Sequence, residues 1–353
     1  MDAVTLADIW FAAVAALFTG YLVLEGFDFG VGVLLAYLPK EERERQVMVG
    51  TIGPAWDGNE VWLIAAAGAL FAAFPQWGAA LFSAFSLPLL LILLALIVRG
   101  MAFTYRGSRD TKRWRRNWDR CLFWSSLAPA FLWGVVFANV VRGIALDGKH
   151  EFAGPIWGLL NPFAILGGLT TLALFVTHGA VFLAVKTMGR IRRKAKGVAE
   201  KSGVIAAVLA VVFLTWAQAM EGSFVSVLLA AVAIGAWCVA MAANFFGREG
   251  WAFAGSAAAI GAAAVSLFAA LHPDVLPSTA GSENGLDIEN AASTPKTLQI
   301  MTWVAVVFLP LVLLYQSWTY WVFRRRIGGR NIPAGHNQGD LANAGEGGAR
   351  RRR

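Results

Sequence analysis

Long apolar stretches alternate with short polar segments along most of the chain. A helix that crosses a bilayer needs about 20 predominantly apolar residues. Nine stretches have about that length or more, and they predict an all-α integral membrane protein with nine transmembrane helices. The predicted spans are 8–38, 46–74, 79–104, 121–142, 160–186, 203–221, 224–246, 251–271 and 298–323.

Two of the polar breaks are only a few residues long, and an alternative count depends on them. Residues 221–223 separate the sixth and seventh spans, and residues 247–250 separate the seventh and eighth. If one of these breaks belonged to a re-entrant segment, the chain would have eight spans. Within the second span, Gly53 and Pro54 predict a kink.

The distribution of basic residues separates these two counts. With nine spans and the N-terminus outside, 26 of the 30 Lys and Arg residues fall on the inner side, 3 fall on the outer side, and Arg99 lies within a span. Cytoplasmic loops of membrane proteins carry an excess of Lys and Arg. The asymmetry therefore favours nine spans with the N-terminus outside and the C-terminus in the cytoplasm.

Composition excludes an ordinary soluble enzyme. The chain is 58 % hydrophobic and 15 % charged, whereas soluble domains are about 45–50 % apolar and about 25 % charged. The net charge of +8 indicates no nucleic-acid partner, because the basic residues are spread over loops and the tail. Cys121 and Cys238 both lie in apolar stretches and allow no disulfide framework. We divide the chain into a membrane domain, 1–326, and a disordered basic cytoplasmic tail, 327–353.

Four acidic residues lie within the first two predicted spans. Glu25 and Asp28 are three residues apart in the first, and Asp57 and Glu60 are three apart in the second. Residues at this spacing share a helix face. An ionised side chain inside a membrane costs at least about 2.5–3.5 kcal/mol, so these acids are candidates for function.

The short loop between the first two spans makes them antiparallel. Asp28 and Asp57 are equidistant from the centre of this loop, and so are Glu25 and Glu60. If both helices are regular, each of these pairs lies at a matched depth.

Arg99 and Asn59 complete the candidate site. With the four acids they suggest a proton pathway, because carboxyl groups inside membranes often form proton relays. The alternative is a structural cluster in which Arg99 and Asn59 hold the helices in register. Taken alone, Arg99 also fits an anchor that extends to the inner membrane surface.

Two further features concern helix packing. Gly26 and Gly30 form a GxxxG pattern that allows a neighbouring helix to approach closely. His178 lies in the fifth predicted span without a second His or Met at a matching position. It therefore favours a hydrogen bond between helices over haem ligation.

Several motifs occur in a family-specific order. By these motifs, and over nearly the whole chain to about Phe323, the sequence closely resembles subunit II of the cytochrome bd quinol oxidases, including the cyanide-insensitive variants. The motifs are E-G-F-D-F-G-V-G at 25–32, P-A-W-D-G-N-E-V-W at 54–62, G-A-L-F-A-A-F-P at 68–75, R-W-R-R-N-W-D at 113–119, L-L-N-P-F at 159–163, T-H-G-A at 177–180 and T-L-Q-I-M-T-W-V-A-V-V at 297–307.

The resemblance implies a respiratory heterodimer of the bacterial cytoplasmic (inner) membrane that oxidises membrane quinol and reduces dioxygen to water. It places haem b and haem d in the partner, subunit I, and no haem or metal in subunit II. It implies two four-helix bundles and one peripheral helix. Small single-span accessory subunits, lipids and a structural quinone are further partners that the resemblance allows.

The resemblance also carries roles to individual residues. It places Asp57 at the subunit interface, on a proton route from the cytoplasm. At the position of Glu25 relatives carry Asp or Glu, whereas at that of Glu60 they carry Gln. The leading hypothesis is thus an accessory subunit in which Asp57, Glu25 and Asp28 relay protons. In this hypothesis Arg99 tunes the pKa values of these acids.

Two other classes of function stay open at this point. A purely structural subunit would stabilise subunit I and its cofactors without relaying protons. A proton-coupled transporter would also have acids inside the membrane and helices interrupted by Gly and Pro, but no inverted repeat is visible in the sequence.

Overall fold

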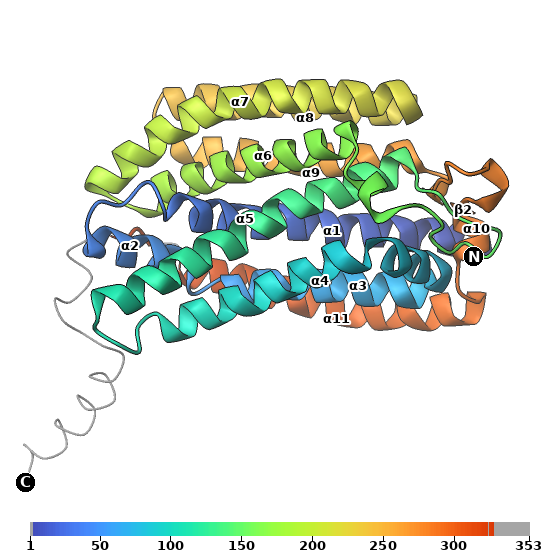
Figure 1. Ribbon diagram of the computed structural model, residues 1–353, viewed down its shortest axis with the longest axis horizontal. Helices are drawn as coiled ribbons and strands as arrows, with labels where there is room; N and C mark the ends of the chain where they lie inside the picture. The colour runs from blue at the N-terminus through green and yellow to red at the C-terminus, as the bar shows by residue number, and fades with distance from the viewer. Residues whose placement is uncertain (1–2, 324, 328–353) are drawn as a thin grey trace, which may run out of the picture.

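The computed structural model describes residues 3–323 and 325–327. Apart from Ile327, the predicted basic tail lies outside the described residues. The long helices run side by side along the long axis of the molecule, as Figure 1 shows. They are α1 (Ala3–Leu34), α2 (Glu42–Ile52), α3 (Trp56–Ala73), α4 (Pro75–Tyr105), α5 (Lys112–Arg142), α6 (Pro162–Lys186), α7 (Gly189–Glu221), α8 (Phe224–Phe245), α9 (Glu249–Leu271) and α11 (Pro295–Val322).

Eight of the described helices are long and apolar enough to cross a membrane. They are α1, α4, α5, α6, α7, α8, α9 and α11, and each coincides with one predicted span. The structure thus confirms an all-helical, multi-pass membrane protein. The 18-residue helix α3 is not among the eight, and its first five residues include Asp57, Asn59 and Glu60.

The second predicted span, 46–74, is not one continuous helix. Helix α2 ends at Ile52 and α3 begins at Trp56. The break contains Gly53 and Pro54, and proline has no backbone N–H to continue the helical hydrogen bonds. The interruption expected as a kink is therefore a complete break between two helices.

Two helices begin well before the predicted spans. Helix α5 begins at Lys112 instead of residue 121, and α7 begins at Gly189 instead of residue 203. Both early segments are rich in Lys and Arg. A hydropathy pattern finds only the part of a helix that lies in lipid, whereas these helices continue beyond it.

Both of the short breaks end helices. Helix α7 ends at Glu221, and Ser223 caps the start of α8 through a reciprocal hydrogen-bond pair with Ser226. Between α8 and α9, Gly247 has a φ of +74°, a conformation that glycine adopts readily. Helices α7, α8 and α9 are consequently three separate helices, each long and apolar enough to cross a membrane.

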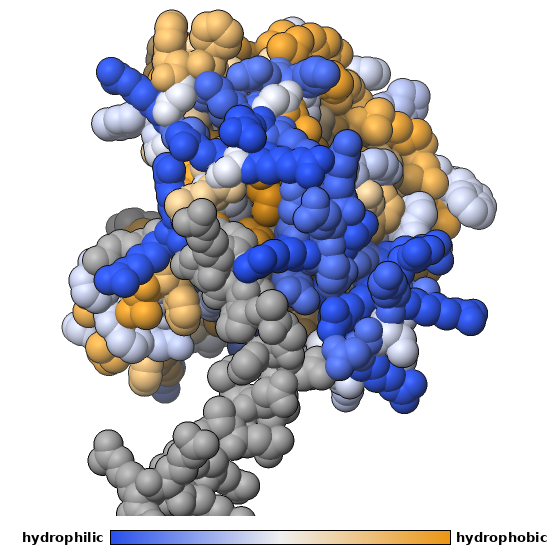
Figure 2. Space-filling view, turned by 90° about the vertical axis from the view of Figure 1, so that its left-hand side faces the viewer, coloured by the Kyte–Doolittle hydropathy of each residue, from blue (hydrophilic) through white to orange (hydrophobic). Residues whose placement is uncertain are grey.

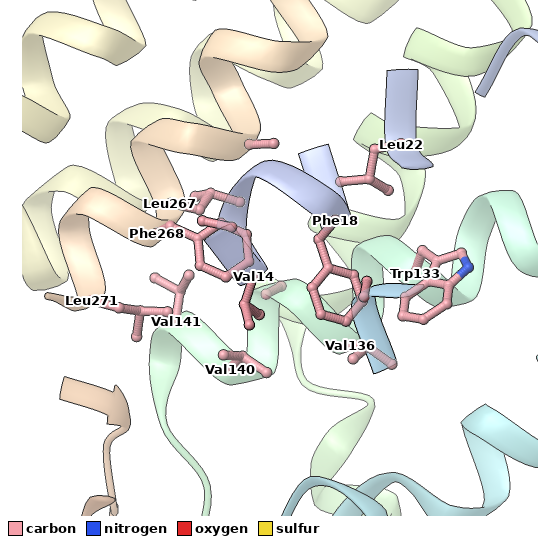
Figure 3. Packing of buried hydrophobic residues seen from close by; sticks show 14 of the residues in the cluster. Val14, Phe18, Leu22, Trp133, Val136, Val140, Val141, Leu267, Phe268 and Leu271 are labelled. Carbon is pink, nitrogen blue, oxygen red and sulfur yellow. The ribbon is translucent and has the colours of Figure 1, made fainter. Parts of the chain in front are cut away.

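Helix α1 lies at the centre of the molecule and contacts α3, α5, α6 and α9. Figure 3 shows Val14 and Phe18 of α1 among apolar side chains of α5 and α9, including Trp133 and Phe268. At Gly30, an added Cβ would collide with the backbone of α6. The GxxxG pattern thus allows α1 and α6 to touch, as the sequence predicted.

The segments between α5 and α6 and between α9 and α11 fold against each other. Strands β1 (Asp274–Leu276) and β2 (Leu286–Asp287) pair antiparallel, and Ile144 bridges to Ser278. Helix α10 (Ile288–Ala291) and the short 3-10 helices η1 (Ile156–Leu159) and η2 (Ser282–Asn284) complete this region. The paired segments are too short to produce a strand pattern in the sequence.

Candidate functional site

Helices α1, α3 and α4 bring together a carboxylate–arginine cluster, which consists of Glu25, Asp28, Glu60 and Arg99. Arg99 Nη1 donates to Glu25 Oε1 and, at 3.3 Å, to Glu60 Oε1. Arg99 Nη2 lies 4.0 Å from Asp28 Oδ2. The side chains of Glu25, Asp28 and Arg99 are fully buried, whereas that of Glu60 is 19 % exposed. Three carboxyl groups thus converge on one guanidinium.

Asn59 links the cluster to helix α11. Its Nδ2 donates to Asp28 Oδ2 at 2.7 Å. Its Oδ1 accepts from Tyr320 Oη at 2.6 Å and from Gln316 Nε2 at 3.3 Å. Gln316 and Tyr320 are not among the site residues predicted from the sequence. Their spacing of four residues, which places two polar side chains on one face of an apolar helix, is the signal that could have found them.

Aromatic rings cover the guanidinium of Arg99. Its Cζ lies 4.9 Å from the ring centre of Phe29 and 5.5 Å from that of Phe103. Four buried polar atoms of the cluster have no hydrogen-bond partner in the described part of the chain: Glu25 Oε2, Asp28 Oδ1, and Arg99 Nε and Nη2. The cluster therefore has hydrogen-bonding capacity that the described residues leave unused.

Asp57 does not join the cluster. It is exposed on the first turn of α3, and Asp28 pairs with Asn59 instead. Glu25 and Glu60, by contrast, both reach Arg99, as their matched positions predicted. Asp57 stays outside the cluster because its side chain is exposed on α3, whereas Asn59 and Glu60 of the same helix reach the cluster.

Asp57 shares α3 with a row of exposed apolar side chains that includes Val61 and Ile64. The neighbouring helices are also exposed, since only 22 % of the span in α4 and 6 % of that in α11 are buried. A carboxylate facing hydrocarbon is costly. We therefore expect protein or water, rather than lipid, to cover Asp57.

His178 lies in α6, on the other side of α1. It is fully buried, its Nδ1 lies 2.7 Å from Ser256 Oγ of α9, and its ring stacks on Phe253 with 4.7 Å between centroids. It forms the interhelical hydrogen bond that the sequence predicted. In residues 3–323 and 325–327, no group of three or more His, Cys, Asp and Glu side chains is arranged to hold a metal ion.

A second ion network joins α2, the end of α4 and α5. Arg106 Nε donates to Asp119 Oδ1 at 2.6 Å, and its Nη2 donates to Glu42 Oε1 at 2.8 Å. Burial alone would lower the pKa of Arg106, but the bonds to Asp119 and Glu42 raise it. The motif at 113–119 thus ends on the carboxylate that ties α5 to its neighbours.

Comparison with known proteins assigns the family. Residues 6–323 match the family described as cytochrome bd terminal oxidase subunit II. The chain is 39 % identical over 331 residues to cytochrome bd ubiquinol oxidase subunit 2 of Bacillus subtilis (strain 168), which covers 92 % of this chain and 97 % of that relative. It is 32 % identical over 369 residues to cytochrome bd-I ubiquinol oxidase subunit 2 of Escherichia coli (strain K12), with 93 % and 96 % covered.

A solved structure, that of the bd oxidase from Geobacillus thermodenitrificans, has a similar fold. The TM-score is 0.71 over 90 % of this chain and 99 % of that chain, at 16 % sequence identity. This similarity concerns the fold alone. The sequence matches, however, cover almost the entire chain, and they agree with the motifs that carried the resemblance. The chain therefore belongs to the cytochrome bd terminal oxidase subunit II family.

Proposed function

We propose that this chain is the haem-free subunit II of a quinol-oxidising, dioxygen-reducing enzyme of the bacterial cytoplasmic membrane. In this role it supports subunit I and contributes a proton pathway from the cytoplasm. The relatives from B. subtilis and E. coli, named as ubiquinol oxidase subunits, support the reaction. The carboxylate–arginine cluster is the observation that carries the proton pathway.

The proposed topology has nine spans, with α3 as the ninth. At 1.5 Å per residue, the 18 residues of α3 extend about 27 Å, close to the roughly 30 Å of the hydrocarbon core. Hydrophilic side chains gather at the end of the molecule that Figure 2 shows, where α2 and the basic beginnings of α5 and α7 lie (Figure 1). Because basic residues favour the inner side, this end faces the cytoplasm and the N-terminus lies outside.

The arrangement of the helices supports two four-helix bundles and one peripheral helix. Helix α11 is the peripheral one, since it contacts only α1 and α3 closely and is largely exposed. The exposed face of α3 and α4 is where we expect subunit I to dock.

The proton pathway begins at Asp57 and ends in the buried cluster. Glu60 lies three residues after Asp57 on the same face of α3 and is still partly exposed. Arg99 then connects Glu60 to the fully buried Glu25. Exposure thus falls stepwise along the series, as expected of a path from a wet surface into the protein.

The haems belong to subunit I in this proposal. His178, the buried His of α6, supports this view because it is enclosed by Ser256, Phe253 and Phe27. We assign haem b and haem d to the partner and leave a bound quinone or lipid without assigned residues.

The substitution Asp57→Asn in the assembled oxidase tests the pathway. The amide keeps the size of the side chain but cannot relay a proton. We expect quinol-driven oxygen consumption to fall on the order of 100-fold, the lower end of what a positioned proton-transfer group contributes, while the haem content stays normal. Asp57→Glu should restore much of the rate, and Asp287→Asn, an acid of the outer loop, serves as the matched control.

The same experiment separates the structural alternative, which the contacts of Arg99 with α1 and α3 favour. A purely structural subunit would respond to Asp57→Asn with lower haem content and poorer assembly. Normal turnover with full haem content would exclude a relay through Asp57.

A further inference from the structure

A groove of about 680 Å³ opens at the proposed cytoplasmic end, between the end of α1, the beginning of α2 and the beginning of α5. We call its apolar lining residues, Leu35, Ala36 and Phe123, the floor, and its charged lining residues the rim. Pockets of roughly 300–1,000 Å³ commonly hold small-molecule ligands. The groove therefore has room for a charged group with an apolar attachment.

Some of the charged side chains on the rim neutralise one another. Arg115 Nη2 donates to Asp110 Oδ1 at 2.6 Å, and Arg45 Nε lies 3.6 Å from Asp119 Oδ2. These pairs shape the groove but leave little free charge for a ligand.

Three other cations on the rim are free. Lys112, Arg116 and Arg120 line the groove and are exposed, and no carboxylate of the described residues lies within 4 Å of them. They follow one another at intervals of four residues, so they form a stripe along one face of α5. The stripe presents three unpaired positive charges to whatever enters the groove.

The stripe lies at the depth of lipid headgroups. Helix α5 has 31 residues and is about 46 Å long at 1.5 Å per residue, whereas the hydrocarbon core is roughly 30 Å thick. Trp124, which is 63 % exposed, continues the stripe by four residues, and Tyr37 packs on Phe123 at 5.9 Å between ring centres. Trp and Tyr are enriched where hydrocarbon meets headgroups.

We propose that this groove binds an acidic phospholipid. The phosphate lies between Lys112, Arg116 and Arg120, and the glycerol and acyl chains follow Phe123 and Trp124 towards the membrane. Charge complementarity selects an anion, and the apolar floor selects one with hydrocarbon attached. The site goes beyond the proposed function, and only its assignment to the cytoplasmic leaflet rests on the proposed orientation.

Native mass spectrometry of the purified oxidase complex, incubated with phosphatidylglycerol or phosphatidylcholine, tests the proposal. We expect tight binding of one phosphatidylglycerol by the wild-type complex. The triple variant K112Q/R116Q/R120Q should bind it on the order of 100-fold more weakly, since each cation near a membrane surface contributes about fivefold. The control R193Q/K201Q/R248Q removes the same charge from exposed positions elsewhere at this end and should bind as the wild type does.

Two outcomes would overturn the proposal: equal weakening in the groove variant and the control, or equal binding of phosphatidylcholine by the wild type. If the groove variant fails to assemble, the wild-type complex can be labelled with a photoactivatable phosphatidylglycerol and the labelled residues identified. Label in the segments that line the groove, 35–45 and 110–124, supports the site, and label only outside these segments refutes it. Neither measurement depends on oxygen turnover, so failure here is distinct from failure of the proton pathway.

Discussion

Helix α1 presents two contrasting regions to its neighbours. Towards α3 and α4 it places Glu25 and Asp28 against Arg99. Towards α6 it places Gly30 against the α6 backbone and stacks Phe27 on Phe182, with 4.2 Å between the ring centres. One helix thus buries charge on one side and close-packed glycine and aromatic side chains on the other.

The two regions differ in what they contribute to stability. Burying an ion costs several kcal/mol, and the attraction to a partner repays this only with excellent geometry. Close packing of small and aromatic residues is favourable by itself. The contrast indicates that packing on the α6 side holds the helices together, whereas the carboxylate–arginine cluster contributes little net stability.

Among the substitutions that test these two regions, removal of the Arg99 guanidinium should have the largest effect on stability. Arg99→Met leaves three carboxyl groups, two of them fully buried, without their guanidinium, and breaking a buried ion pair in this way costs about 3–5 kcal/mol. We expect little assembled complex, as measured by yield and thermal unfolding. A second substitution, Glu25→Gln, should restore part of the lost stability because it removes one unpaired carboxylate. A complex of Arg99→Met with wild-type stability would show that the cluster is not charge-balanced by Arg99.

Overpacking the α1–α6 contact tests the other region. Gly179→Val places a side chain against the backbone of Gly30 and Val31, and we expect a loss of about 1–3 kcal/mol or more, as for other overpacked sites. Thermal unfolding of the purified complex measures it. Gly68→Ala is the matched control, because no atom lies within 4 Å of an added Cβ there. Equal behaviour of the two variants would contradict a close helix contact.

His178 offers a smaller test, on the α6 side. His178→Leu removes the hydrogen bond to Ser256, whose hydroxyl still donates to Phe253 O. We therefore expect a loss of about 1 kcal/mol with an unchanged optical haem spectrum. Disappearance of one haem band at normal protein yield would assign this histidine a role as a haem ligand.

The smallest effect is expected at Glu44 of α2, outside the eight spans. Partial burial opposes its ionisation, but the backbone N–H of Lys40 and the ammonium of Lys194 lower its pKa overall. A lowered carboxyl pKa stabilises the fold at neutral pH, and this stabilisation disappears as the pH falls through that pKa. Glu44→Gln should thus lower the free energy of unfolding near neutrality by about 0–1 kcal/mol and leave it unchanged in acid, as measured by thermal unfolding at both pH values. A difference that grows in acid would contradict this assignment.

Much of the architecture could be predicted because lipid imposes a simple rule on each segment. Eight of the predicted spans coincide with single helices, since a run of apolar residues long enough to cross the bilayer has to be helical. The early starts of α5 and α7, and the small sheet β1–β2, could not be predicted. Their residues lie outside the apolar runs, where tertiary contacts decide the structure.

The sequence identified residues of the candidate site whose burial in a membrane is energetically costly. It did not predict how their side chains are arranged in space. An acidic residue inside an apolar stretch is a functional candidate because its burial in a membrane is costly. Glu25, Asp28 and Glu60 could therefore be selected from the sequence alone. The partners Gln316 and Tyr320 are distant in sequence, and nothing local indicates that α11 packs beside Asn59.

The sequence by itself determined the class of protein, the family, and the presence of charged groups where burial is expensive, because each of these depends on composition or local order. Only the tertiary structure decided which of those groups meet. It joined Glu25 and Glu60 through Arg99, paired Asp28 with Asn59, and left Asp57 on an exposed face. The physical reason is that the meeting of these side chains depends on how α1, α3, α4 and α11 pack against one another, and these helices are too far apart in the sequence for a local pattern to encode that packing.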